Sequence, residues 1–425
     1  MSKTSLISLT VAFGILVGGH SGVAAAADGD PAGPECNKRV EVVFWTANRH
    51  RILMRELAAN PAPCTDYWIS VPAADNDKTM PRARGVYTEI RNLGPQFHPM
   101  AEVVLGTASG WASWVSNGNG SWYDAGVEMR RRMATLNLRL DLGETWLLNE
   151  FDRTTRLDSS IPGLPHAYTR TAMKELVRGL YEGAPGMQPL PGAVEIGVSF
   201  AHQNLPDVPT YKAEMRPYLQ DAEFWTFLDG KVRWLLHEAY ADTRNHGVPG
   251  SALEERRVHL QAYVFHLLEL VKAGGRRTLA AQRFLQATIM PFVNGGGYAA
   301  PGGDEFGFVS GHGNTMVPLD DMMKFVSEQI YTVRHYAQQH RGEAPGTRIG
   351  FSWQPSNRFN LPLDEFEANA QAIAARLAEA LRWSYGPGNE AAGACITPGT
   401  IVDWCTFERT GAIFVETWAD FSSWH

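Results

Sequence analysis

Short runs rich in Val, Ile, Phe and Trp alternate along the chain with longer stretches of helical spacing. Runs of this composition predict buried strands. In chain order they occupy residues 40–45, 67–71, 101–106, 146–148, 193–200, 234–240, 285–290 and 348–353. Helical spacing occurs at 52–59, 122–133, 211–227, 253–271, 319–340 and 363–383. Eight strands that alternate with helices predict an α/β protein with a (β/α)8, TIM-like barrel.

Two alternatives to this reading stay open. Residues 234–240 could extend the preceding helix, although Asp229-Gly230 interrupts the helical pattern between them. An open, doubly wound sheet competes with the barrel, but it normally has a glycine-rich first turn. The stretch that follows the first strand, Thr46-Ala47-Asn48, contains no glycine. We therefore favour the barrel.

Both ends of the chain depart from the alternation. Lys3, an apolar run at 6–17 and the small residues Ala24 to Ala27 predict a signal peptide over residues 1–27, with a retained N-terminal anchor as the alternative. The barrel is expected over residues 28–386. Residues 387–425 hold one further strand-like run, 413–418, and predict a C-terminal extension packed on the barrel. We expect the mature protein to be secreted.

Four cysteines in an exported chain favour two disulfides over metal ligands. Three pairings are possible, and we favour Cys36–Cys64 and Cys395–Cys405. Cys36 and Cys64 each precede one of the first two strands, so a parallel sheet would place both at its N-terminal end. Because the chain contains neither a Cys-x-x-Cys pair nor an HExxH motif, we predict no metal and no cofactor.

Charge and hydropathy exclude two classes of partner. The formal net charge is −7, and its signs are scattered without a basic stripe, so we expect no nucleic-acid binding. Beyond the first residues, no apolar run approaches the roughly 20 residues of a membrane-spanning helix, so we expect no membrane insertion. The expected state is a monomer that acts on a carbohydrate.

Chemistry in a barrel is expected at the C-terminal ends of its strands, which share one mouth. The side chains predicted there are acidic, amide-bearing or aromatic, a mixture that suits sugar hydroxyls and ring faces. The predicted substrate-binding residues are Trp45, Asn48, Asn149, Asp152, His202, Tyr240, Asp242, Trp353 and Asn357. The alternative for each tryptophan is a place in the core.

Glycosidic cleavage needs two carboxyl groups, one protonated and one ionised. Glu150 and Glu238 are the two glutamates predicted to lie directly at strand ends, and they are the catalytic candidates. Glu144 lies at the opposite end of its strand. Each candidate has an alternative: Glu150 could form a salt bridge to Arg153 or Arg156, and the element that carries Glu238 could be helical.

The run Trp146-Leu147-Leu148-Asn149-Glu150 resembles the fourth strand of a large clan of retaining (β/α)8 glycoside hydrolases. The stretch from Gly350 to Pro355 is similar to the aromatic eighth strand of such barrels. The resemblance implies that Glu150 is the acid/base. The clan's nucleophile follows the seventh strand, where this chain has no glutamate, so Glu238 on the sixth strand is the expected partner. The predicted function is a secreted glycoside hydrolase, with a non-catalytic carbohydrate- or cell-wall-binding barrel as the alternative.

Overall fold

The computed structural model describes residues 40–46, 49–72, 80–104, 121–149, 151, 170–191, 194–202, 222–239, 290–293, 348–353, 355 and 361–385. Within these ranges the strands are β1 (Val40–Thr46), β2 (Thr65–Pro72), β3 (Phe97–Val104), β4 (Trp146–Asn149), β5 (Ile196–His202), β6 (Val232–Ala239), β7 (Met290–Val293) and β8 (Arg348–Trp353).

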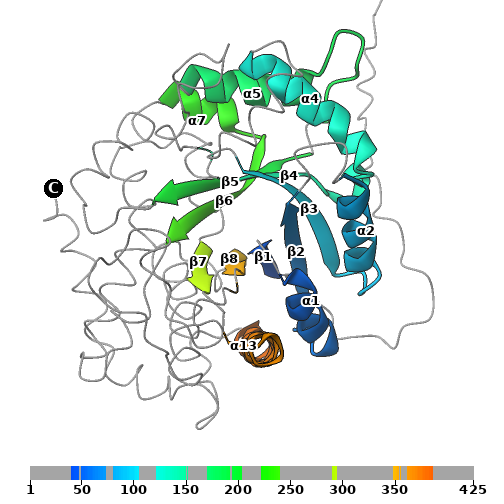
Figure 1. Cartoon of the computed structure of the whole chain (residues 1–425). Helices are drawn as coiled ribbons and strands as arrows, with labels where there is room; N and C mark the ends of the chain where they lie inside the picture. The colour runs from blue at the N-terminus through cyan, green and yellow to red at the C-terminus, as the bar shows by residue number, and fades with distance from the viewer. Residues whose placement is uncertain are drawn as a thin grey trace, which may run out of the picture. The chain divides into compact units, whose positions relative to one another are not determined.

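The strands form one parallel sheet in the order in which they occur along the chain. Each pairs with the next, and β8 pairs with β1, so the sheet closes into a barrel (Figure 1). A doubly wound sheet would instead reverse its strand order and stay open. The predicted α/β class with parallel strands is therefore confirmed, and residues 234–239 are a strand rather than a helical extension.

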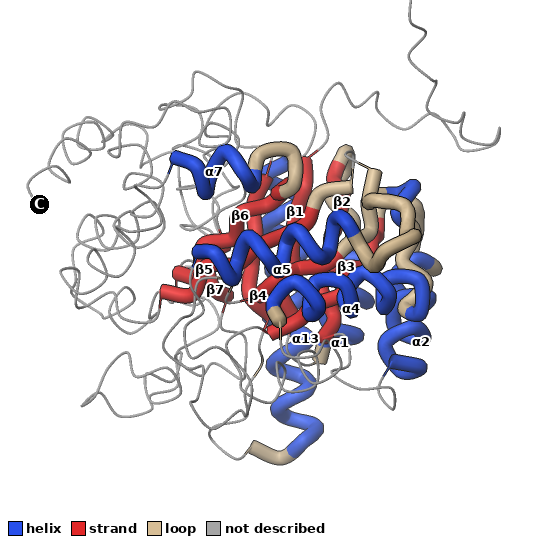
Figure 2. The backbone as a smooth tube through the Cα atoms, turned by 90° about the horizontal axis from the view of Figure 1, so that it is seen from above, coloured by secondary structure: helices blue, strands red, loops and turns tan. Residues whose placement is uncertain are grey.

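Helices follow six of the strands. They are α1 (His50–Ala59), α2 (Met80–Arg91), α4 (Trp122–Thr135), α5 (Arg170–Glu182), α7 (Ala222–Leu228) and α13 (Leu363–Tyr385), and a short 3-10 turn, η1 (Leu140–Leu142), precedes β4. In Figure 2 the helices lie around the strands. Helix α2 packs on β2 and β3, α4 on α5, and α13 on α1. The segments that follow β6 and β7 lie outside the described residues.

Helices α4 and α5 approach each other through glycines. A Cβ atom added at Gly126 would lie 2.0 Å from the backbone oxygen of Leu176, and one added at Gly179 would lie 1.9 Å from that of Tyr123. Such distances are far inside van der Waals contact, so only glycine allows this separation of the two backbones. The pair fixes how closely α4 and α5 cover the barrel beside β4.

The barrel interior is filled by side chains that alternate along each strand. One buried cluster joins Val43, Trp45, Trp68, Met100, Leu147, Trp234 and Leu236, which come from β1, β2, β3, β4 and β6. Strands on different sides of a closed barrel meet only in its interior, so these side chains point inward. Because side chains alternate with a period of two, Ser70, Glu102 and Asn149 share the inward face with Trp68, Met100 and Leu147. A polar layer therefore lies above the apolar one, toward the C-terminal ends of the strands.

The strands whose bounds differ most from the sequence prediction are β3 and β7, and β5 begins at Ile196 rather than at residue 193. β3 begins at Phe97, four residues before its predicted start, and β7 runs from Met290 to Val293 instead of ending before Pro291. α2 and α5 were not predicted. The predicted helices at 253–271 and 319–340, the signal peptide and the C-terminal extension lie outside the described residues.

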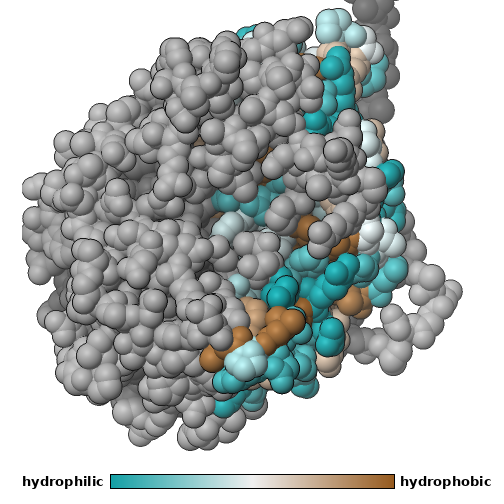
Figure 3. All heavy atoms as spheres, in the orientation of Figure 1, coloured by the Kyte–Doolittle hydropathy of each residue, from teal (hydrophilic) through white to brown (hydrophobic). Residues whose placement is uncertain are grey.

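Two further findings concern the surface and the cysteines. No helix among the described residues is long and apolar enough to cross a membrane. On the face drawn in Figure 3, hydrophilic side chains cover most of the described surface, with hydrophobic ones among them. Cys64, directly before β2, is disulfide-bonded. Cys36, Cys395 and Cys405 lie outside the described residues, so both predicted pairings stay predictions.

Candidate functional site

Glu102 on β3 is the central group of the polar layer. It is 1% exposed, and three side chains from three other strands donate hydrogen bonds to its carboxylate. The indole N–H of Trp45 and the amide Nδ2 of Asn149 donate to Oε1, the latter over 3.1 Å, and Ser70 Oγ donates to Oε2 over 3.2 Å. Donors of this kind offset the cost of burying a carboxylate.

The positions of these donors follow from the strand register. Trp45 is the next-to-last residue of β1, Asn149 is the last of β4, and Ser70 and Glu102 each lie two residues before the end of their strand. All four therefore lie near the end of the barrel at which barrel enzymes place their active sites. We call these four residues the Glu102 cluster.

Backbone contacts hold the hydroxyl of Ser70 in place. Ser70 Oγ accepts a hydrogen bond from the backbone N–H of Thr46 over 3.3 Å, and Thr46 Oγ1 donates to the backbone oxygen of Ser70. With one lone pair taken by Thr46, the hydroxyl hydrogen of Ser70 is directed at Glu102. The carboxylate is thus held by a preorganised set of donors.

Asn149 has one satisfied and one unsatisfied end. Glu102 Oε1 accepts from the indole N–H of Trp45, which can only donate, so the amide must turn Nδ2 toward this oxygen. This orientation turns Oδ1 away from the carboxylate. Asn149 is 3% exposed, and Oδ1 has no hydrogen-bond partner among the described residues. A buried acceptor without a partner costs about 1–3 kcal/mol, and a ligand group that donates to this atom would recover that cost.

A second polar group lies at the N-terminal end of the barrel, and it is built around an ion pair. Arg233 forms an ion pair with Glu41, and its guanidinium lies 4.7 Å from the ring centroid of Trp68 and 4.5 Å from that of Trp234. Trp234 Nε1 also donates to Glu41 over 3.1 Å. These opposite charges satisfy each other, and polar groups at this end of a barrel serve stability.

One tyrosine reports on the electrostatics around the cluster. Burial, together with the nearby Glu102 carboxylate, raises the pKa of Tyr87, so its hydroxyl stays neutral at physiological pH. Tyr87 belongs to α2, which packs on the strand that carries Glu102. Among the described residues, no three His, Cys, Asp or Glu side chains gather as a metal site would require.

The structure brings together two of the predicted site residues, Trp45 and Asn149, and joins them through Glu102, which the sequence prediction did not include. Trp45 is largely buried and Trp353 fully so, and Trp353 Nε1 donates to the backbone oxygen of Arg49 over 3.2 Å. Both tryptophans thus act as hydrogen-bond donors inside the protein, and Trp353 exposes no ring face on which a sugar could stack.

For the remaining predicted site residues, the structure describes either the backbone alone or neither backbone nor side chain. Glu238 and His202 belong to β6 and β5, where Ala201 pairs with Glu238 and His202 with Ala239, but their side chains are not described. The residues outside the described ranges are Glu150, Asn48, Asp152, Tyr240, Asp242 and Asn357. Their predicted roles stay predictions.

Comparisons with known proteins give little information about the function of this chain. No protein-family model and no curated protein match the chain. A solved structure of a citrate lyase from Burkholderia xenovorans LB400 is similar over 92% of this chain and 93% of that one, at 12% sequence identity and a TM-score of 0.29. A TM-score this low carries no argument about what the chain does.

The predicted glycoside hydrolase is corrected on these findings. None of the comparisons names a glycoside hydrolase: no family model and no curated protein matches, and the similar solved structure is named a citrate lyase. At the C-terminal ends of the described strands, the buried carboxylate held by three donors is Glu102, and it is not one of the predicted pair. We therefore assign neither a glycoside hydrolase activity nor a lyase activity to this chain.

Proposed function

We propose that this chain binds a hydroxylated small molecule at the C-terminal ends of β1 to β4, with the amide oxygen of Asn149 as the central contact. The proposed scaffold is a complete (β/α)8 barrel in which a helix follows every strand. The six described helices that follow strands support this scaffold. Binding, without hydrolysis, is the function proposed.

One observation carries the proposal: Asn149 Oδ1 is a buried acceptor without a partner among the described residues, at the end of the barrel that holds ligands in this fold class. Native proteins pair nearly all of their buried polar atoms, so an unpaired one needs an explanation. A ligand hydroxyl that donates to Oδ1 supplies that partner.

The surroundings of Asn149 also favour binding. Its amide is fixed through Glu102, and Glu102 is fixed by Trp45 and Ser70, so little side-chain freedom is lost when a ligand docks. Preorganisation of this kind raises affinity because less ordering accompanies binding. Saccharides are the first ligands to test, because they carry many hydroxyl donors and the predicted mouth residues are rich in amides and acids.

Four predictions about the whole protein remain part of this proposal. We propose that the mature chain is secreted after removal of residues 1–27, that it is a monomer, and that residues 387–425 pack on the barrel. We further propose that Cys36 is the partner of Cys64. The disulfide at Cys64 supports an oxidising compartment, since such bonds are rare in the cytosol.

The test is a binding screen with matched variants of β4 and the residue before it. Purified protein is titrated calorimetrically with glucose, galactose, xylose, N-acetylglucosamine, and cello-, xylo- and chito-oligosaccharides. Asn149→Leu removes the amide at nearly constant volume. Thr145→Val is the control, because Thr145 is also buried with an unpaired hydroxyl but precedes β4 at the opposite end of the barrel.

We expect at least one saccharide to bind wild type and Thr145→Val equally, and Asn149→Leu to bind it about 5- to 150-fold more weakly, the factor that corresponds to one unpaired buried acceptor. Circular dichroism establishes that each variant is folded. If no saccharide binds the wild type, or if Asn149→Leu binds as tightly as wild type, the proposal is wrong.

A further inference from the structure

We propose that Glu102 is a positioning residue that sets the hydrogen-bonding sense of the site: by holding Asn149 Nδ2, it leaves Oδ1 as the presented atom and so selects a ligand group that donates a hydrogen bond. This inference rests on the proposed function and names the chemistry of its ligand. The selected group is a hydroxyl or an amine. A methyl ether at the same place is rejected.

The geometry around Glu102 Oε1 fixes the orientation of the Asn149 amide. That oxygen accepts from both Trp45 Nε1 and Asn149 Nδ2. The indole nitrogen of Trp45 carries a hydrogen and can only donate, so Oε1 must be an acceptor. An amide that faces an acceptor turns its NH2 group toward it. Asn149 is therefore locked in one of its two orientations.

This orientation leaves the oxygen at the opposite end of the amide as the group that faces a ligand. Oδ1 is buried and has no hydrogen-bond partner among the described residues, and a carbonyl oxygen can only accept. A ligand oxygen without a hydrogen would meet Oδ1 lone pair to lone pair and leave it unpaired. Sites built to hydrogen-bond a particular group discriminate strongly against analogues that lack it.

Glu102 acts on the ligand through Asn149 and not by direct contact. Trp45, Asn149 and Ser70 all direct their donors at Glu102, so its role can be performed by any side chain of the same shape that keeps an acceptor at Oε1. Glutamine does so: in Glu102→Gln the new carbonyl oxygen would accept from Trp45 and Asn149, while the Ser70 hydroxyl can rotate to accept from the new amide. Leucine does not, because both donors would lose their acceptor.

A ligand-free experiment tests the contact between position 149 and Glu102 on which the orientation depends. Asn149→Asp places a second carboxylate against Glu102, the carboxylate to which the native amide donates, with the neutral Tyr87 as the nearby titratable group on α2. Two carboxylates that share a site raise the pKa of one of them. The folded variant then takes up a proton between pH 7 and pH 5 while its unfolded chain does not.

The expected result is that, relative to wild type, the unfolding equilibrium constant of Asn149→Asp falls by roughly tenfold or more from pH 7 to pH 5, with about 100-fold as the limit for one proton over two pH units. Asn149→Leu is the control, and its constant relative to wild type should not change with pH. If Asn149→Asp shows no such change, Nδ2 does not face Glu102 and the inference is overturned, whatever the protein binds.

The ligand experiment tests the selection. A saccharide that binds in the screen is compared with its mono-O-methyl derivatives, on wild type, Glu102→Gln and Glu102→Leu. We expect one methyl ether to bind at least tenfold more weakly to wild type and to Glu102→Gln, and Glu102→Leu to lose the preference. Rescue by glutamine but not by leucine identifies positioning, since a residue that acted through its charge would fail in both variants.

The outcomes separate the two proposals. If the pH test succeeds but no saccharide binds, the proposed function fails, and Glu102 orders the barrel without selecting a ligand. If a saccharide binds through Asn149 but every methyl ether binds equally well, the proposed function stands and donor selection is overturned.

Discussion

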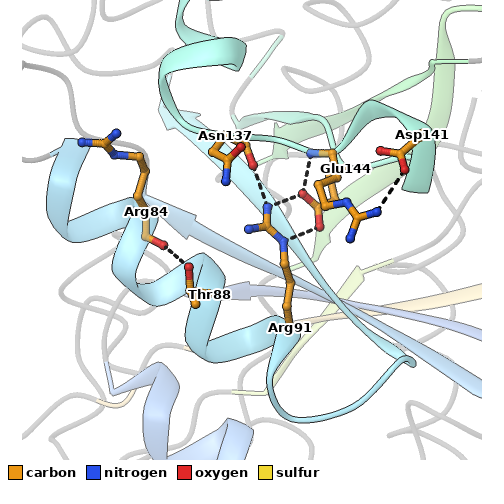
Figure 4. A network of polar contacts seen from close by, with 7 residues as sticks. Arg84, Thr88, Arg91, Asn137, Asp141 and Glu144 are labelled. Atoms are coloured by element: carbon orange, nitrogen blue, oxygen red, sulfur yellow. Dashed lines mark hydrogen bonds and ion pairs between the residues drawn. The ribbon is translucent and has the colours of Figure 1, made fainter.

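The sharpest stability prediction concerns the pair of Arg91 at the end of α2 and Glu144, two residues before β4. Arg91 Nε donates to Glu144 Oε1 over 2.8 Å, and Arg91 Nη2 donates to Oε2 over 2.5 Å. Arg91 Nη2 also donates to the backbone oxygen of Asn137, and the backbone N–H of Arg139 donates to Glu144 Oε2, over 2.8 and 2.7 Å (Figure 4). The pair therefore ties α2 to the turn that leads into β4.

The perturbation is Arg91→Met, which keeps the length of the side chain and removes its charge. The side chain of Glu144 is 1% exposed, so the variant leaves a buried carboxylate to which, among the described residues, only the Arg139 N–H still donates. Removal of one partner from a fully buried ion pair costs about 3–5 kcal/mol. Because the Arg91 side chain is 19% exposed and water reaches the site, we expect a loss of about 2–3 kcal/mol.

A matched control involves the same helix, α2. Arg51 of α1 pairs with Glu89 of α2 through the same two-pronged geometry, with distances of 2.7 and 2.9 Å, but these side chains are 55% and 46% exposed. Exposed ion pairs contribute about 0–1 kcal/mol. Arg51→Met should therefore cost less than about 1 kcal/mol, and the difference between the two variants follows from burial together with the additional bond of Arg91 to the Asn137 backbone oxygen.

The assay is urea unfolding followed by circular dichroism, with the disulfide at Cys64 intact. A double-mutant cycle with Glu144→Gln isolates the interaction, since glutamine still accepts from Arg139 and no longer needs a charged partner. We expect a coupling free energy of about 2 kcal/mol between positions 91 and 144. Additive losses in the double variant, or equal losses for Arg91→Met and Arg51→Met, would refute the reasoning.

Three further predictions follow from the packing. Gly179→Ala should destabilise the protein by about 1–3 kcal/mol, because the new methyl group meets the backbone of α4, whereas Gly85→Ala in α2, with open space around it, should stabilise by about 0.5–1 kcal/mol, both measured by urea unfolding. Burial raises the pKa of Tyr67 from 10.0 to about 12, so the folded state keeps a proton that the unfolded state releases. Stability should therefore fall as pH rises from about 10 to about 12, and Tyr67→Phe should flatten that fall in pH-dependent unfolding curves. Arg233→Met should cost about 2–3 kcal/mol by leaving Glu41 buried without its cation, and should leave ligand binding at the other end of the barrel unchanged in calorimetry.

The strands were the most predictable part of the fold. Parallel strands in a closed barrel are buried on both faces, so they appear as near-continuous apolar runs, and β8 was predicted to the residue at Arg348–Trp353. The two strands with the largest shifts contain prolines. Pro99 lies within β3 and Pro291 within β7, although proline more often marks a position outside a strand. Sequence composition alone does not tell where the pairing of a strand begins.

The two helices that were not predicted carried a readable signal. In α5 the buried residues Met173, Leu176, Val177 and Leu180 have the spacing of one helical face. In α2 the same spacing is present, but a proline and a glycine interrupt it at positions 81 and 85. The α4–α5 glycine contact could not be predicted. It depends on the distance between the two helices, and the sequence of neither helix indicates that distance.

The site was predictable in place but not in composition. Trp45 and Asn149 were correctly placed near strand ends, since that required only the strand boundaries. Glu102 lay within an apolar run, Ala101-Glu102-Val103-Val104, where a charged residue is costly unless donors surround it. A charged residue within a predicted buried strand was therefore the sequence feature that indicated the site. Glu41 between Val40 and Val42 shows the same feature at the other end of the barrel. Both carboxylates prove to be buried and hydrogen-bonded, but only three-dimensional pairing distinguishes them: Glu41 has an arginine, whereas Glu102 holds an amide whose oxygen is still unmatched among the described residues. A charge inside a buried strand thus indicates where to look, and its partners indicate whether it stabilises the fold or prepares a site.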